Sequence, residues 1–483
     1  MMLGSSCPES RRPARPVVRR CLIALIVAAS IAFAGSIASA APARQATAAA
    51  APSPYFSTAL NYVVRFYPRF MTYFQQSLAG ANRIAGPNRV GPLYGFVVSI
   101  NVDTIYASFY LDLSQGPQIF TIPTTGATYS LLTLDVFGDV FKTNIQPQTP
   151  GTYGLVPAGF KGTLPPGVTE VQVPYPVTTW IIRADKYSSS GQNQVDQASA
   201  FRASLRLASL QTYETDPSAG ATRIVPQAAL ALRMKAIADD TVLFHTTHFF
   251  RVVQAALRSP ATAPLSSSDL QLSAAFNRLF ARANAAARHG NRGPLSQMIR
   301  GARTAHTLII DRWLSHVDRN HWIYFSNFAD WGTAYLDRAA GNEYIQYGNN
   351  ASAAGYYNAF ADGSGAPLNG SVVHAYRLTF SKKQIPQANR FWSLTAYLPR
   401  GNTLVPNAAR KYEVASFTPG LVRNRDGSIT IYIRTAPPAA ALRANWLPVP
   451  RGPFDLLLRV YGPTGNTATG HYLPPPIRPS RVP

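Results

Sequence analysis

The fold of this chain is decided by three runs near its end: FWSLTAY at residues 391–397, SITIYIR at 428–434 and FDLLLRVY at 454–461. Each run is rich in apolar and aromatic residues, and turn residues such as Asp426-Gly427 separate the runs. Short runs of this kind between turns are typical of antiparallel strands, and glycine accepts the positive φ of a tight turn. Residues 391–463 therefore predict an antiparallel β domain, and they carry no catalytic signature.

The composition allows several packed cores. The chain has 483 residues, of which 46% are hydrophobic and 14% charged; a length of this order predicts about three domains. The formal net charge is +23, and the basic residues are nearly all Arg, with only seven Lys. They are scattered rather than gathered into one tract, and no recognition helix or stacking motif accompanies them, so we expect no nucleic-acid partner.

The N-terminus has the pattern of an export signal. A basic segment precedes an uncharged apolar run at 21–34, and Ala38-Ser39-Ala40 supplies small residues at the spacing that a signal peptidase accepts. We expect a signal peptide at 1–40, removed by cleavage, and a disordered leader at 41–54. The alternative is that the apolar run is kept as a membrane anchor, because with its flanking residues it is just long enough to span a bilayer.

Both cysteines, Cys7 and Cys21, fall within the expected signal peptide. The mature chain would then have no thiol and no disulfide. No other apolar run reaches membrane length, so we expect no integral membrane segment after cleavage. These features predict a secreted or cell-envelope protein.

The remainder of the chain changes from β to helical and back to β. Residues 55–79 have apolar residues at helical spacing, and about seven short strands follow up to residue 183, which is typical of a small β-sandwich. Helical periodicity then takes over and includes an expected helix over 198–210. The expected domains are an N-terminal β domain with a leading helix at 55–194, a helical domain at 195–350 and a C-terminal β domain at 351–483.

Two groups of motifs resemble known families. Residues 101–108 (NVDTIYAS), with Asp112-Leu113 and 129–137, resemble the domain of unknown function 1254. The second group resembles the domain of unknown function 1214 and comprises 376–380, 391–395, Asn407, 426–428, 445–448 and 458–463. The two domains commonly occur in this order in exported bacterial proteins, and no activity is established for them.

This resemblance covers most of residues 60–480 and implies a fold class. The fold would be mainly β with a helical insert: an N-terminal immunoglobulin-like β-sandwich, a middle helical domain and a C-terminal jelly-roll-like β-sandwich. The chain departs from the family pattern at Val102, where the family usually has Arg. Any ion pair made by that Arg is therefore absent here.

Four polar residues of the first β domain are candidate ligand-binding residues: Asn101, Asp103, Tyr106 and Asp135. Asp103 beside the Tyr106 hydroxyl could act as a general base or as a ligand acceptor. The structural alternative is a local hydrogen-bonded turn, with the tyrosine used for packing. Asp135 and Asp139 could hold a cation, but no third oxygen ligand lies at a recognisable spacing, which favours a solvated turn.

Motifs for metals, cofactors and nucleophilic hydrolases are missing from the sequence after the expected signal. His245 and His248 lie about one helical turn apart, but no Glu-x-x-His or His-Glu-x-x-His motif occurs, so we expect helix-packing histidines and no metal site. Neither Gly-x-Ser-x-Gly nor Ser-x-x-Lys is present, and there is no phosphate loop or dinucleotide fingerprint. We expect no cofactor.

The last β domain adds six candidate ligand-binding residues: Trp392, Tyr397, Asn407, Asn445, Trp446 and Arg459. Aromatic faces with amides and Arg are the components of a sugar-binding face, but they are equally the components of a β core with a buried polar group. Trp392 and Trp446 lie within apolar runs, which favours the core. Asn445 and Arg459 need polar partners if they are buried, so they are the better site candidates.

The functional hypothesis is a protein that binds a carbohydrate or another small envelope ligand in a cleft between the two β domains. A hydrolase that uses a carboxylate such as Asp103 or Asp135 is one alternative. A structural homo-oligomer is another.

Overall fold

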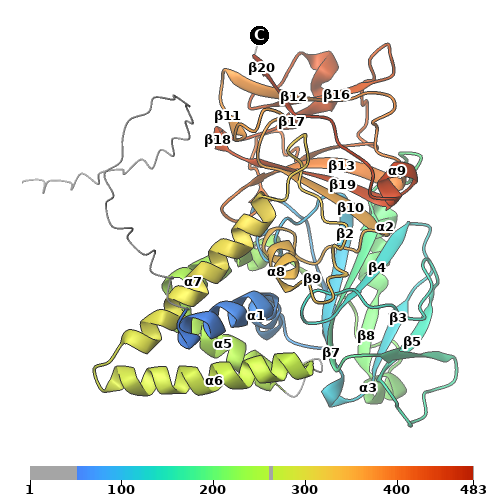
Figure 1. The fold of residues 1–483 in the computed structure, drawn as a ribbon. Coiled ribbons are helices and arrows are strands. Elements are labelled where there is room, and N and C mark those ends of the chain that lie inside the picture. Colours follow the sequence, from blue (N-terminus) through green and yellow to red (C-terminus); the bar gives the residue numbers. More distant parts are fainter. Residues whose placement is uncertain (1–51, 260–264, 482–483) are drawn as a thin grey trace, which may run out of the picture. The chain divides into compact units, whose positions relative to one another are not determined.

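The computed structural model describes residues 52–259 and 265–481, and the residues from Pro52 onward form one compact unit. The expected signal peptide at 1–40 and nearly all of the expected leader lie outside the described residues. Helices and strands both make up large parts of the unit (Figure 1). The expectation of a mainly β protein with a helical part is therefore confirmed only in part.

A long helix opens the described chain and confirms the prediction for residues 55–79. This helix, α1 (Pro54–Ala79), begins where the Ser53 hydroxyl accepts a hydrogen bond from the Tyr55 amide at 3.3 Å. It continues through Pro68 and ends before Gly80, whose φ of +77° stops the helix. Apolar residues at helical spacing bury its inner face.

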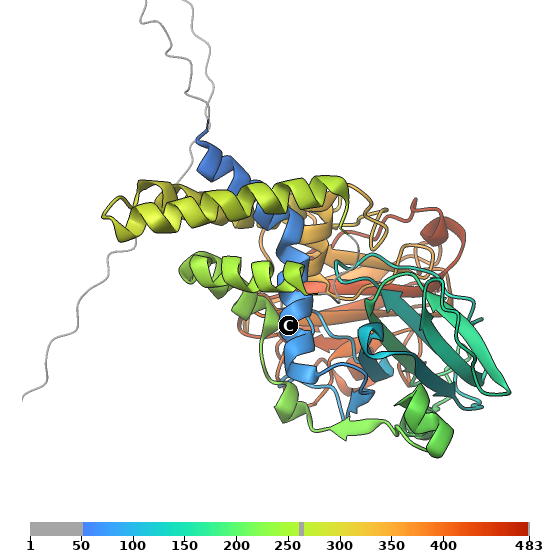
Figure 2. The same cartoon turned by 90° about the horizontal axis from the view of Figure 1, so that it is seen from below.

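The other long helices pack around α1. They are α4 (Met234–Phe244), α5 (Thr246–Arg258), α6 (Ser267–Arg288), α7 (Gly293–Leu314) and α8 (Tyr335–Tyr344). Helices α5 to α8 all contact α1, and Figure 2 shows α1 (blue) crossing the green helices. No helix within residues 52–259 and 265–481 combines the length and the apolar character needed to cross a membrane.

Two sheets in the first β part enclose one core, and we call them the first sheet pair. Their strand orders are β4-β7-β2-β1-β9 and β6-β5-β3-β8. The strands are β1 (Ala85–Pro87), β2 (Thr104–Asp112), β3 (Gln118–Ile122), β4 (Tyr129–Leu134), β5 (Gly151–Pro157), β6 (Val168–Val173), β7 (Val177–Asp185), β8 (Arg206–Ser209) and β9 (Arg223–Val225). Phe109, Phe120 and Trp180 form the aromatic centre of this core.

The helix expected over residues 198–210 is wrong in its second half. Helix α2 (Val195–Ser204) ends early, and the next residues form β8, which pairs with β3. Leu205 and Leu207 are buried in the first core, so packing against the sheet prevails over helical periodicity. Short elements complete this part: α3 (Leu210–Thr215) and the 3-10 turns η1 (Leu113–Gln115) and η2 (Gln227–Leu230).

Strands of the last β part form the second sheet pair, around a separate core. The orders are β10-β19-β13-β14, with β15 beside β13, and β17-β16-β12-β20. The bounds are β10 (Ala354–Ala359), β11 (Asn369–Gly370), β12 (His374–Phe380), β13 (Ala388–Leu398), β14 (Thr403–Leu404), β15 (Glu413–Ala415), β16 (Ile429–Arg434), β17 (Trp446–Pro448), β18 (Gly452–Pro453), β19 (Asp455–Pro463) and β20 (Arg478–Arg481), with η3 (Ala440–Asn445) and α9 (Gly465–Ala468). The three predicted strands are confirmed as β13, β16 and β19.

Each sheet pair presents one sheet to the other pair. On β2, Phe109 faces the first core while Tyr110 faces away, because successive side chains of a strand point to opposite faces. On β19, Val460 faces the second core and Tyr461 faces away. The two outward faces meet where Asn101 Nδ2 donates to Tyr461 Oη at 2.7 Å. Strand β7 is buried along its whole length, so both of its faces are covered.

Candidate functional site

A small cavity with a free volume of ≈ 50 Å³ lies between the two sheet pairs. This is room for about four water molecules or a ligand of a few atoms. Six tyrosines line it: Tyr94, Tyr106, Tyr110, Tyr347, Tyr356 and Tyr461. The guanidinium groups of Arg183 and Arg459 belong to the same wall, as does the amide of Asn101. The cavity is therefore polar and cationic, with no carboxylate in its lining.

Arg183 comes from β7 and is buried, with 4% of its surface exposed. Its Nη2 donates to the carbonyl oxygen of Tyr347 at 2.7 Å, and the Tyr106 ring centroid lies 5.5 Å from its guanidinium carbon. The other two nitrogens, Nε and Nη1, make no hydrogen bond of normal length and angle to a described residue, and the nearby Tyr106 hydroxyl interacts with the guanidinium only loosely. Arg183 thus has spare donor capacity in a buried position, which native structures rarely leave unused.

Arg459 comes from β19, and its guanidinium makes more hydrogen bonds than that of Arg183. Its Nη2 donates to the Ser99 carbonyl at 2.5 Å and to the Tyr397 hydroxyl at 2.8 Å. The Tyr397 hydroxyl in turn donates to the Ile100 carbonyl at 2.7 Å. These bonds join β13 and β19 to the loop before β2, so they fix one wall of the cavity.

A buried carboxyl pair, Asp103 and Glu413, lies in the same contact region but outside the cavity lining. Ser393 donates to Asp103 Oδ2 at 2.8 Å. Burial, together with the negative charge of Asp103, raises the pKa of Glu413 well above its usual range. The shift favours the protonated form of Glu413, whose carboxyl can then donate to Asp103, an acid whose Oδ1 has no other partner.

The contact region carries more positive than negative charge. Its cations are Arg183, Lys186, Arg390 and Arg459. Arg390 forms a bidentate pair with Asp185, with Nε 2.9 Å from Oδ2. The acidic groups in the contacts described above are Asp185 and the Asp103–Glu413 pair. The four cations outnumber the three acidic groups, so positive charge is in excess, and buried charges need partners.

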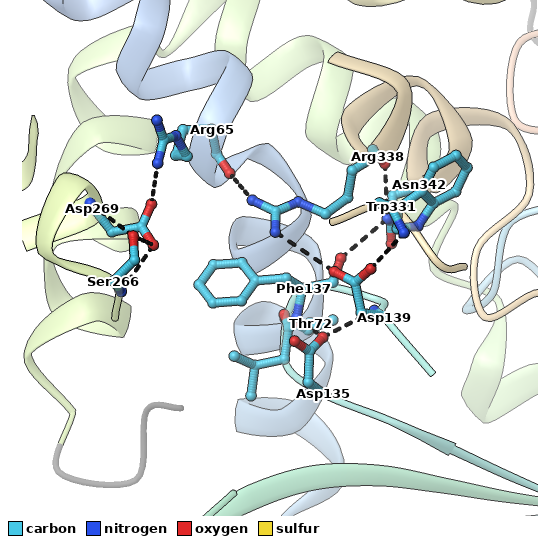
Figure 3. A network of polar contacts seen from close by, with 11 residues as sticks. Arg65, Thr72, Asp135, Phe137, Asp139, Ser266, Asp269, Trp331, Arg338 and Asn342 are labelled. Atoms are coloured by element: carbon cyan, nitrogen blue, oxygen red, sulfur yellow. Dashed lines mark hydrogen bonds and ion pairs between the residues drawn. The ribbon is translucent and has the colours of Figure 1, made fainter. Parts of the chain in front are cut away.

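Asp135 does not line this cavity and closes a turn that docks on the helices. Its Oδ1 accepts hydrogen bonds from the Phe137 and Asp139 amides at 2.8 and 2.9 Å. Asp139 accepts from the Trp331 amide at 2.8 Å and lies 3.6 Å from Arg338 of α8 (Figure 3). Asp135 is buried, and that burial raises its pKa to about 6. The expectation of a solvated turn is thus wrong.

Four further candidates hold local structure in the second sheet pair. Trp392 is buried in the second core, and Trp446 donates its indole N–H to the Arg434 carbonyl at 2.8 Å. Asn407 donates to the Lys411 carbonyl at 2.8 Å. Asn445 joins the backbone of residue 422 to that of residue 430 through its side-chain amide. None of the four lines the cavity.

The sequence candidates therefore separate into two groups. Asn101, Tyr106 and Arg459 line the cavity, and Asp103 and Tyr397 lie next to it through the bonds already described. The other five are elsewhere. Arg183 was missed, because a polar residue at an alternating position of a strand looks like a solvent-facing residue until another sheet is known to cover it.

The helical part contains a buried ionic cluster that the sequence did not predict. One ligand atom each of Asp239, His306 and Glu343 lies within 4.8 Å of the others, the only such set of three among the described residues. Lys235 Nζ lies 2.9 Å from Asp239 Oδ2 and also bonds to Glu343 Oε1. The ammonium group of Lys235 thus lies between the two carboxylates, where a metal ion would otherwise lie. Tyr67 donates to the second oxygen of Glu343.

A weak sequence signal for this cluster existed. Glu343 is one of only four Glu after residue 40, and Lys235 is one of seven Lys. Rare residue types within helices that otherwise use Arg and Ala are candidates for a specific partner. By contrast, His245 and His248 are exposed, so the expectation that they pack against helices is wrong.

Comparison with known proteins gives two family matches. Residues 81–209 match the family described as protein of unknown function DUF1254, and residues 353–465 match the family described as protein of unknown function DUF1214. No curated protein matches the chain.

Two solved structures resemble the chain. The VPA0106 protein from Vibrio parahaemolyticus is 17% identical, with a TM-score of 0.55, over 88% of this chain and 100% of that one. An uncharacterized protein from Burkholderia cenocepacia is 14% identical, with a TM-score of 0.40, over 89% of this chain and 94% of that one. The first likeness concerns the fold alone. The family matches follow one another along the chain in the order of the two β parts. The chain therefore carries a DUF1254 domain followed in tandem by a DUF1214 domain.

Proposed function

We propose that this protein binds a small anion in the cavity between the two sheet pairs. The observation that carries the proposal is Arg183, a buried guanidinium in the cavity wall with two nitrogens that make no hydrogen bond of normal geometry to a described residue. A buried donor without an acceptor costs about 1–3 kcal/mol, and more when the group is charged. A carboxylate or oxyanion in the cavity would accept from Arg183 and remove that cost.

Charge favours an anion over the neutral carbohydrate that the sequence suggested. A sugar offers hydroxyl acceptors, but it leaves the excess positive charge of the contact region without a counter-charge. The tryptophans that would have stacked on a sugar ring lie elsewhere, whereas tyrosine hydroxyls surround the cavity. Hydroxyl donors suit the oxygens of a small anion.

The hydrolase alternative receives less support. Asp103 is fully buried, bonds to Ser393 and pairs with Glu413, and Asp135 closes a turn. Neither carboxylate lines the cavity. The homo-oligomer alternative remains a prediction that light scattering on the mature protein would test.

Finer features of fold and location belong to the same proposal. The first sheet pair would be an immunoglobulin-like sandwich and the second a jelly-roll-like sandwich, supported by the two separate cores between paired sheets. Export to the cell envelope is supported by the apolar run and the Ala38-Ser39-Ala40 motif of the sequence.

Thermal and calorimetric titration would test anion binding. Acetate, phosphate and neutral sugars would be compared at constant ionic strength on the wild type, on Arg183→Met and on the exposed control Arg278→Met. We expect an anion to stabilise the wild type and the control by about 1.4 kcal/mol at a concentration tenfold above Kd. Arg183→Lys, which keeps the charge, should retain part of the effect. Equal anion binding by Arg183→Met, or stabilisation by sugars alone, would refute the proposal.

A further inference from the structure

An open groove with a free volume of ≈ 380 Å³ lies directly beside the cavity. It is bounded by the end of α1, by β1, β2 and β9, and by η2. Most of its lining is apolar, with Leu78, Val225, Leu230 and Leu232 among its walls. A volume of a few hundred cubic ångströms is that of an ordinary small-molecule site.

The groove and the cavity share part of their walls. Five residues line both: Pro87, Tyr94, Phe96, Ser108 and Tyr110. Ser108 lies in the middle of β2, where both neighbouring residues are buried, yet its own side chain is exposed. Solvent therefore reaches this point of the sheet, at the junction of an apolar groove with a cationic cavity.

The rim of the groove exposes apolar surface that packing within the chain does not cover. Leu78 is 53% exposed and Leu232 is 42% exposed. Arg83 and Arg223 are the basic residues of the lining, and both are exposed. Contiguous apolar surface beside a polar pocket is a common feature of binding sites for ligands with an apolar part.

We infer that the ligand is an alkyl carboxylate, with its carboxylate in the cavity and its apolar chain in the groove. The inference rests on the proposed anion site and adds the chemical class of the ligand. Arg183 supplies the free donors for the head group, and the shared wall at Ser108 lets one molecule occupy both spaces. The leucines at the rim would cover the chain and lose their own exposure to water.

Isothermal titration with a series of carboxylates would test this inference. Acetate, butyrate, hexanoate and octanoate would be titrated below their micellar concentrations, with octanol as the uncharged comparison. We expect Kd to fall by about two- to fourfold for each added methylene, because each buried methylene contributes favourably. In Ser108→Phe, which fills the junction, octanoate should bind no better than acetate. Leu232→Ser should weaken octanoate more than acetate, while the exposed control Leu270→Ser should change neither.

The outcomes separate the inference from the proposed function. If acetate binds in an Arg183-dependent way but longer chains bring no gain, the alkyl-chain inference is refuted and the anion site stands. If no carboxylate of any length binds, both the alkyl-chain inference and the proposed anion site are refuted. If octanol binds as tightly as octanoate, the head-group assignment is refuted. Chain-length gains that Ser108→Phe removes support the inference.

Discussion

Asp455, the first residue of β19, should make the stability of this protein depend strongly on pH. Its side chain is fully buried, and Oδ2 accepts from Asn358 Nδ2 at 3.0 Å while Oδ1 has no partner among the described residues. Burial raises its pKa from 3.8 to about 7, although the Asn358 bond and the positive charges of Lys235 and Arg459 oppose the shift. The folded protein therefore favours the protonated carboxyl.

The sign and size of the effect follow from this shift. In the unfolded chain the group ionises near pH 4, whereas in the folded protein it stays neutral up to about pH 7. Its contribution to stability is complete below pH 4 and is lost as the pH rises through the folded pKa. The pKa difference of about three units corresponds to the whole loss of stability, and about two of these units act between about pH 5 and pH 9. At 1.36 kcal/mol per unit, the folded protein loses about 3 kcal/mol of stability over this pH range.

Urea unfolding followed by tryptophan fluorescence would measure the effect. Asp455→Asn removes the ionisation, so its stability should fall less than that of the wild type between about pH 5 and pH 9, with a difference of about 3 kcal/mol. The exposed Asp330→Asn is the matched control and should follow the wild type at both pH values. Curves for Asp455→Asn and the wild type that run parallel within about 0.5 kcal/mol would refute the reasoning.

Two further predictions concern buried carboxylates. Lys235→Met should destabilise the fold by about 3–5 kcal/mol, because it leaves Glu343 charged and without its ammonium partner. Adding Glu343→Gln should recover part of that loss in a double-mutant cycle by urea unfolding; strictly additive losses would contradict the pairing. Glu413→Gln should change the free energy of unfolding near neutral pH by less than about 1 kcal/mol, because the raised pKa favours a protonated Glu413 and an amide can likewise donate to Asp103. A loss of several kcal/mol would mean that Glu413 is ionised.

Local pattern determined much of the fold. The helix at 55–79, the three strands within 391–463 and the burial of Trp392 follow from periodicity, which reports which side of an element is apolar. The same local rules predicted a helix at 206–209, where the structure has strand β8. These residues fit a helical pattern equally well, but they pair with β3.

The polar candidates show the limit of this approach. Asn445 and Arg459 gave the same signal, a polar residue among apolar ones. Asn445 proves to join two nearby backbone segments, whereas Arg459 reaches across to Ser99, 360 residues earlier in the chain. The partner decides which residue belongs to a site, and the partner is not encoded locally.

The sequence by itself determined the strands, the leading helix and the order of the two β parts, because each depends on residues close together in the chain. Only the tertiary structure decided that the outward faces of two sheets cover each other and enclose Arg183 in a cationic cavity. Alternation along a strand distinguishes its two faces, but it does not say whether water or another sheet lies over the polar one. Burial by that second sheet turns ordinary surface residues into the proposed anion site.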